Sequence, residues 1–193
     1  MPSKQTNPIQ GYKKSDIGVI AVFQLGGVLH RIDLEDVAIK AYELAPKIFC
    51  WNKHPERINL EKARLALKDE LTAKNSRIAG SIRDGWMLRP SGVSYCINLK
   101  SFVALQNIME PIRRELSIVK TTPAFIKTVK GDIGNISGID INSLLRVNPY
   151  FSIREVHDRV LALSNIAVFD RDLQTVLNRL ITKGFKELEA LNE

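Results

Sequence analysis

The sequence predicts a mainly α-helical fold with one small β-hairpin. Apolar residues recur at helical spacing, capping residues precede several of these runs, and an Asp-Gly pair separates two short β-compatible runs. With 45% hydrophobic residues the 193-residue chain can bury a core, which argues against disorder. We predict a flexible tail over residues 1–13, a first domain over 14–99, a connector helix and Gly-containing linker over 100–138, and a C-terminal helical domain over 139–193.

The first domain is predicted to contain three helices before the hairpin. They span about residues 15–25, 34–45 and 60–73, and a short, aromatic, β-prone segment at 48–51 precedes the third. Each helix follows a residue type that caps helix N-termini: Ser15 or Asp16, Asp33 and Asn59. Gly26 ends the first helix and Pro46 ends the second.

A hairpin is predicted where residues 76–83 and 86–89 flank Asp84-Gly85. Glycine accepts the positive φ angle of a tight two-residue turn, so this dipeptide is a strong hairpin signal.

This order of helix, helix, short strand, helix and hairpin is that of a winged helix. Leu88-Arg-Pro-Ser-Gly92 resembles the Leu-Thr-Pro-x-Gly segment that commonly closes the wing, with Arg89 in the place of threonine. The resemblance covers about residues 15–98. It implies binding to duplex DNA, with the third helix in the major groove and the hairpin on the backbone or in the minor groove.

Charge favours a polyanionic partner for this half of the chain. The protein has a net charge of +7, and residues 1–100 carry 16 basic against 10 acidic side chains. The predicted DNA contacts are Lys62, Lys68, Lys74, Arg77, Arg83 and Arg89. If five or six cations touch phosphates, the log-log salt dependence of binding has a slope on the order of −5.

Some side chains near this surface are predicted to serve the fold instead. Arg64 projects close to the apolar face of its helix, which indicates a half-buried arginine with a carboxylate partner, whereas Leu65 projects away from that face. Leu65 is suited to a thymine methyl group or to packing against protein. Trp51 and Trp86 are predicted as core aromatics, because duplex DNA keeps its bases stacked.

The C-terminal half contains a second helical pattern. Asp140 is predicted to cap a short helix at 141–147, Ser152-Ile-Arg-Glu155 is a capping box, and a longer helix follows Asp170. Ser152 to Val156 and Leu173 to Gly184 resemble helix-turn-helix domains of prokaryotic regulators such as the DeoR and WYL groups. The resemblance offers a second DNA contact through side chains that can read base edges: Arg171, Gln174, Thr175 and Asn178.

Residues 139–193 carry seven basic and eight acidic side chains, which favours assembly or docking over independent DNA binding. Leu173, Leu177, Leu180, Leu188 and Leu191 form a stripe that fits either a homodimer or packing within the domain.

Catalysis, metal binding and cofactors find no support in the sequence. The three histidines are scattered, the two cysteines are 46 residues apart, and no nucleophile has an identifiable base. The cysteine usage predicts a reduced, cytoplasmic protein, and the longest apolar stretch is too short and too broken for a membrane span.

Together these observations predict a non-catalytic duplex-DNA-binding protein, either a prokaryotic transcription regulator or a DNA-recognition subunit. The alternative is a winged-helix adaptor with a protein partner, such as an accessory subunit of a defence or DNA-maintenance complex. A third reading is single-stranded RNA binding by the glycine-containing segment 131–138, with Lys127 and Lys130 beside it.

Overall fold

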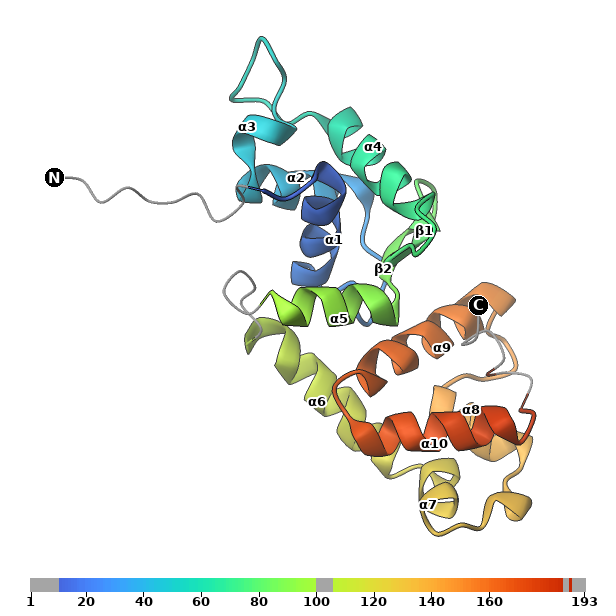
Figure 1. Cartoon of the computed structure of the whole chain (residues 1–193). Helices are drawn as coiled ribbons and strands as arrows, with labels where there is room; N and C mark the ends of the chain where they lie inside the picture. The colour runs from blue at the N-terminus through green and yellow to red at the C-terminus, as the bar shows by residue number, and fades with distance from the viewer. Residues whose placement is uncertain (1–10, 100–105, 186–187, 189–193) are drawn as a thin grey trace, which may run out of the picture. The chain divides into compact units, whose positions relative to one another are not determined.

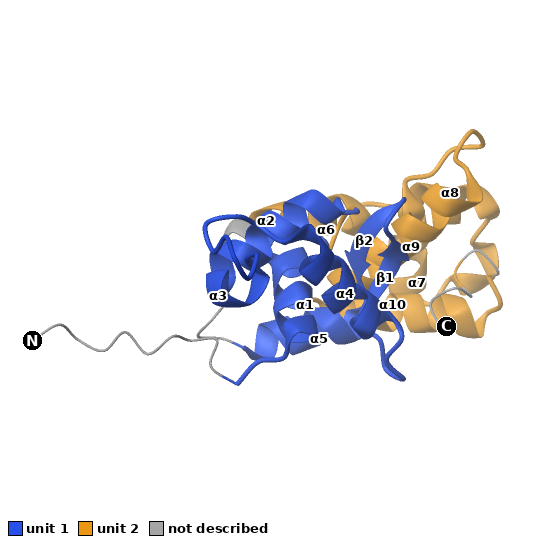
Figure 2. Cartoon of the chain, turned by 90° about the horizontal axis from the view of Figure 1, so that it is seen from above, with its two compact units in different colours: residues 1–27, 31–104 blue, residues 28–30, 105–193 orange. Residues whose placement is uncertain are grey.

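The computed structural model describes residues 11–99, 106–185 and 188, so the tail predicted at 1–13 lies almost wholly outside the described residues. The described chain is mainly helical and carries one two-stranded antiparallel hairpin, as predicted (Figure 1). It divides into two compact units (Figure 2). Unit 1 comprises residues 1–27 and 31–104, and unit 2 comprises 28–30 and 105–193.

Unit 1 is built around its first helix. Its helices within residues 11–99 are α1 (Lys14–Gln24), α2 (Leu34–Leu44), α3 (Pro46–Phe49), α4 (Leu60–Leu71) and α5 (Pro90–Asn98). α1 packs against α2, α4 and α5 and against the second strand, and its side chains Ile17, Ile20 and Phe23 are fully buried. An almost wholly apolar helix fits this central position, because neighbours cover it on several sides.

The three predicted helices of unit 1 are confirmed to within a few residues, but the strand predicted at 48–51 is wrong. Pro46 starts the short helix α3, in which the Ile48 and Phe49 N–H groups donate to the Ala45 carbonyl at 2.9 and 3.1 Å. Proline fits the first turn of a helix because its φ is already helical and its missing N–H is not needed there. Pairing in this region is limited to an isolated bridge between Cys50 and Ile58.

The hairpin consists of β1 (Ile78–Ser81) and β2 (Gly85–Leu88). Its loop differs from the predicted Asp84-Gly85 turn. Ser81 pairs with Gly85, so three residues, 82–84, form the loop, and Gly85 with φ of 78° begins β2. Ile32 also bridges Trp86 through two backbone hydrogen bonds of 2.8 and 2.9 Å, which ties β2 to the segment before α2.

The segment after the hairpin turns directly into α5. Pro90 occupies the first turn, and the Gly92 N–H donates to the Arg89 carbonyl at 2.9 Å. A Cβ atom on Gly92 would lie 2.2 Å from the Arg77 carbonyl oxygen and 3.1 Å from Leu88 Cδ2. Only glycine lets α5 approach the start of the hairpin this closely.

The regular secondary structure among the described residues of unit 2 is entirely helical. Its helices are α6 (Gln106–Lys120), α7 (Pro123–Val129), the 3-10 helix η1 (Ile133–Asn135), α8 (Gly138–Leu145), α9 (Ile153–Ala167) and α10 (Arg171–Thr182). The Gly-containing linker predicted within 100–138 is therefore partly wrong, since α7 lies there and buries Ala124, Phe125 and Thr128. The chain passes from unit 1 to unit 2 at 104/105, so α6 and α7, which fall in the predicted connector, belong to unit 2.

Capping side chains set the starts of the last three helices. The Ser152–Glu155 capping box of α9 is confirmed, and the Asp170 carboxylate accepts from the Leu173 N–H at 2.9 Å at the start of α10. The prediction that Asp140 caps α8 is wrong by one turn. Ser137 is the cap and Asp140 is the third helical residue, whose carboxylate accepts from the Ser137 N–H at 2.8 Å.

The leucine stripe is used inside unit 2. Leu173, Leu177, Leu180 and Leu188 are each at most 4% exposed, and Leu191 lies outside the described residues. These four leucines are buried in the folded chain, and three of them lie on α10, which packs against α7 and α9. Their burial favours packing within the domain over the homodimer that the stripe suggested.

We expect Gly92→Ala to destabilise unit 1 by about 2 kcal/mol, because the added methyl group overlaps the Arg77 carbonyl and the neighbour is backbone. Urea unfolding followed by circular dichroism measures the change. Gly134→Ala is the control, since a Cβ there meets nothing within 4 Å and its φ is not positive. Equal stability of the two variants would contradict the close approach.

Candidate nucleic-acid interface

Arg77 lies at the centre of a buried ionic network in unit 1. Its guanidinium lies 2.9 Å from Asp16 of α1, donates to Glu70 of α4 at 2.5 and 2.8 Å, and stacks 4.2 Å from the centroid of the Tyr95 ring of α5. Its side chain is only 17% exposed. Hydrogen bonding to Glu70 raises the pKa of Arg77, which therefore stays cationic. Arg77 holds α1, α4 and α5 together and has no free edge for a phosphate.

Two more of the predicted DNA contacts are bonded to the fold. The Lys62 ammonium donates to the Cys50 carbonyl at 2.7 Å and to Asn52 Oδ1 at 2.9 Å, which ties α4 to the loop after α3. The Arg89 Nε donates to the Ile78 carbonyl at 3.1 Å, beside the backbone bond from the Arg89 N–H to the Arg77 carbonyl. Both side chains would have to give up these bonds to reach DNA.

The other three predicted contacts are exposed and have no ion pair within the described chain: Lys68 on α4, Lys74 just after α4, and Arg83 in the hairpin loop. We call these three residues the α4–hairpin cations. They come from the predicted helix, from the hairpin loop and from the segment that joins the helix to the hairpin. Their freedom from acidic partners leaves their charge available to an anion.

The exposed face of α4 itself is close to neutral. The Arg64 Nε donates to the Glu61 carboxylate at 2.6 Å, which confirms the predicted carboxylate partner. Asp69 is exposed beside Lys68. This pairing lowers the pKa of Glu61 and raises that of Arg64, so both stay charged. Leu65 is 42% exposed, which confirms its projection away from the core.

The two tryptophans have opposite environments. Trp86 is 2% exposed in β2, which confirms it as a core residue, whereas Trp51 is 54% exposed and the core prediction for it is wrong. Trp51 follows the short helix α3 instead of lying in a strand, so no sheet covers it.

In unit 2 the structure brings the predicted second contact onto one face of α10. Arg171, Gln174, Thr175 and Asn178 are all exposed, at the spacing of three and four residues that places side chains along one helix face. The buried Leu173, Val176, Leu177 and Leu180 form the opposite face. Sequence periodicity was sufficient to predict this division.

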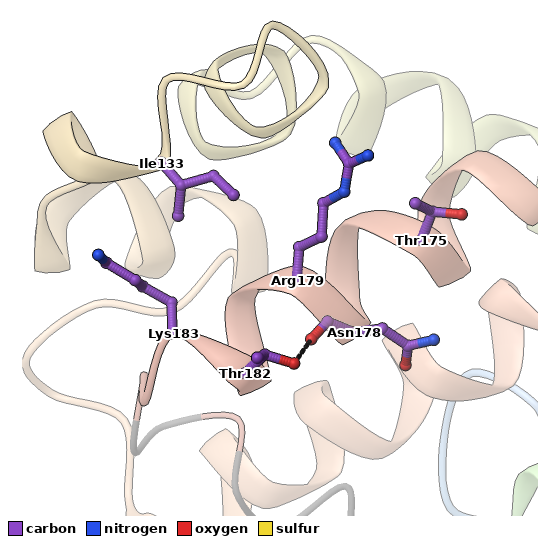
Figure 3. A pocket seen from close by; sticks show the side chains of 6 residues that line it. All are labelled: Ile133, Thr175, Asn178, Arg179, Thr182 and Lys183. Carbon is purple, nitrogen blue, oxygen red and sulfur yellow. Dashed lines mark hydrogen bonds between the residues drawn. The ribbon is translucent and has the colours of Figure 1, made fainter.

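Thr175 and Asn178 also line a concavity of about 460 Å³ with Ile133, Arg179, Thr182 and Lys183 (Figure 3). Arg179 is a further side chain whose type can read base edges, and Lys183 was not predicted as a site residue. The Arg179 Nη1 donates to the Thr128 carbonyl at 3.3 Å, and the Thr182 hydroxyl donates to the Asn178 carbonyl at 2.8 Å. The two cations and the Asn178 amide give this hollow donors for an anionic group.

Polar groups of the glycine-containing segment bind one another and Lys127 within the fold. The Lys127 ammonium donates at 2.9 Å both to the Asn135 carbonyl and to the Asp140 carboxylate, whereas Lys130 is exposed. The hydrogen bonds from Ser137 and Lys127 lower the pKa of Asp140 to about 2. One of the two lysines invoked for RNA binding is therefore a structural residue.

Three findings bear on other chemistry. Burial raises the pKa of the Cys96 thiol to about 12, so this cysteine is a protonated core residue. Within the described ranges, no three His, Cys, Asp or Glu side chains gather in a way that could hold a metal ion. Among residues 11–99 and 106–185, no helix is both long enough and apolar enough to cross a bilayer.

Comparison with known proteins returns no matching family model, no matching curated protein and no matching solved structure.

We expect Glu70→Gln to lower the free energy of unfolding by about 3 kcal/mol, because it removes one partner of a buried ion pair and leaves Arg77 under-compensated. Chemical denaturation measures this loss. Glu61→Gln, which breaks an ion pair on the exposed face of the same helix, should change stability little. A similar effect of the two substitutions would contradict the structural role of Arg77.

We expect Asp140→Asn to destabilise unit 2 in a pH-dependent way. The folded carboxyl has a pKa of about 2 against an ordinary value of 3.8, so its stabilisation is complete above pH 5 and is lost as the pH falls through 4 towards 2. The stability difference between the wild-type protein and the variant should therefore shrink over that interval. Asp132→Asn, in the same segment, is the control; a difference that is constant from pH 6 to pH 2 would contradict the assignment.

Proposed function

We propose that unit 1 is a winged-helix module that binds duplex DNA without chemistry, as a transcription regulator or DNA-recognition subunit does. The observation that carries the proposal is the set of α4–hairpin cations. Lys68, Lys74 and Arg83 are exposed and unpaired within the described chain, at the end of the third long helix and at the tip of the hairpin that follows it.

The order of elements supports the same module. Three long helices, α1, α2 and α4, precede the hairpin β1–β2, and the Leu88–Gly92 segment leads from the hairpin into α5. Gly92 lies where the backbone of Arg77 leaves no room for a side chain, which gives a physical reason for glycine in this motif. The module is held rigid by Arg77, and a rigid helix and hairpin are what groove binding requires.

Electrostatics make the predicted contact with DNA smaller than the sequence suggested. Lys62, Arg77 and Arg89 are bonded within unit 1, so three cations remain for phosphates instead of five or six. Counterion release then gives a log-log salt slope of about −3. Such a protein binds weakly as a single module and gains from a second contact.

Unit 2 offers that second contact through α10. Arg171, Gln174, Thr175 and Asn178 share one exposed face, with Arg179 and Lys183 beside Asn178 around the hollow of Figure 3. Gln and Asn can each make paired hydrogen bonds to adenine, and arginine to guanine. This helix face carries Gln and Asn side chains, which α4 lacks.

We expect Lys68→Ala, Lys74→Ala and Arg83→Ala each to weaken duplex binding by about three- to tenfold at 100 mM salt and to reduce the salt slope by about 1. Fluorescence anisotropy of a labelled 24-base-pair duplex at graded KCl gives both quantities. Lys40→Ala removes the same charge from α2, where Lys40 is paired with Glu43, and is the control.

Indifference of the triple variant Lys68→Ala/Lys74→Ala/Arg83→Ala would overturn DNA binding by unit 1. A single-stranded RNA competitor tests the hypothesis that the glycine-containing segment binds RNA. Preference for that RNA over the duplex, together with loss of binding in Lys130→Ala, would favour the glycine-containing segment instead.

A protein-interaction adaptor is the second candidate, and one observation favours it. Leu65, Leu71 and Ile82 are 42%, 36% and 56% exposed on α4 and the hairpin loop, so apolar surface lies among the α4–hairpin cations. Three exposed apolar side chains on two neighbouring elements suit a protein partner. Loss of partner binding in Leu65→Ser with DNA binding retained would support the adaptor.

A further inference from the structure

A small cavity lies in unit 1 between the C-terminal half of α4 and the hairpin. Its volume is about 180 Å³, its surface is predominantly apolar, and its lining residues are Arg64, Lys68, Leu71, Ser81, Ile82 and Trp86. It is large enough for one ring, because an apolar cavity of about 150 Å³ holds benzene.

Trp86, one of the lining residues, carries an unused hydrogen-bond donor. Trp86 is 2% exposed, and its indole Nε1–H is buried without an acceptor among the described residues. Buried donors are nearly always paired, and leaving one unpaired costs about 1–3 kcal/mol. A ligand that supplied an acceptor to the Trp86 indole N–H would remove this cost.

The other polar groups of the cavity differ in their availability. The Arg64 guanidinium is bonded to Glu61, and the Ser81 hydroxyl donates to Asp84 Oδ2 at 2.9 Å and accepts from the Asp84 N–H at 3.1 Å. The Lys68 ammonium has neither an ion pair nor a hydrogen bond in the part of the chain that the structure describes. One neutral donor and one cation thus remain for a ligand.

We propose that this cavity binds a small apolar carboxylate, with a single ring or a branched aliphatic group of similar size. The hydrocarbon part would pack among Leu71, Ile82 and the Trp86 ring, and the carboxylate would accept from the Trp86 indole N–H and the Lys68 ammonium. A nucleotide is too large for the volume.

A ligand in this cavity would also affect DNA binding, an expectation that rests on the proposed function. Lys68 lines the cavity and is also one of the α4–hairpin cations, and Ile82 is the neighbour of Arg83 in the hairpin loop. A carboxylate on Lys68 removes one phosphate contact. The ligand would therefore weaken DNA binding by about three- to tenfold, the same factor as Lys68→Ala.

Binding is tested without DNA, by adding sodium benzoate to the full chain labelled with ¹⁵N. The two tryptophans give two indole N–H signals in a ¹H–¹⁵N correlation spectrum, and Trp51→Phe assigns them. We expect the Trp86 signal to move saturably, with a dissociation constant on the order of 1 mM for a ligand of this size, while the signal of exposed Trp51 stays in place.

Three comparisons make the test specific. Benzamide, a neutral analogue, and the variant Lys68→Met should each weaken the response about tenfold, because the charge-assisted bond is lost. Leu71→Phe, which fills the cavity, should abolish it. Lys47→Met and Leu60→Phe are matched controls outside the cavity, and urea unfolding shows which variants remain folded.

A Trp86 signal that does not move, or that moves equally with benzamide and in Lys68→Met, overturns the carboxylate site. Equal movement of the Trp51 signal shows non-specific binding and also overturns it. Benzoate binding without any effect on the duplex would leave the site standing and count against the proposed role of Lys68 in DNA binding.

Discussion

The buried guanidinium of Arg77 is the interaction on which unit 1 depends. It bonds to Asp16 of α1 and Glu70 of α4 and stacks on Tyr95 of α5, and its own carbonyl accepts from the Arg89 N–H and touches Gly92. Burial, with the charge of Asp16 as a further cause, raises the pKa of Tyr95 to about 12, so the ring stays neutral beneath the cation. One residue thus sets the positions of three helices and of the hairpin.

The same interaction shows that the net charge counted from the sequence differs from the charge that the surface presents to an anion. Arg77 counts as +1 in any tally of the sequence, yet its charge is balanced by two carboxylates and contributes little field outside the protein. Lys62 and Arg89 are fixed to backbone carbonyls in a similar way. Of the predicted contacts, Lys68, Lys74 and Arg83 remain available to an anion, and these three determine the expected salt dependence.

Local signals in the sequence predicted the helices and the hairpin well, because caps and apolar spacing act over three or four residues. The Ser152–Glu155 capping box and the Asn59 cap are examples, since both bonds form as expected. The role of Arg77 could not be predicted this way, because Asp16 is 61 positions away and only the folded chain brings the pair together. The 48–51 strand failed for a related reason: β-propensity was outweighed by Pro46, which starts a helix.

In unit 2, a slightly negative net charge hides a helix surface with exposed cations. Residues 139–193 are slightly acidic in sum, but Asp140 is bonded to Lys127 and Ser137, and Asp170 caps α10 and pairs with Lys120. These carboxylates act within the fold, close to their partners, and their fields are locally cancelled. Arg171, Arg179 and Lys183 remain exposed on or just after α10, so an anion approaching this helix meets a cationic surface on a segment whose total charge is negative.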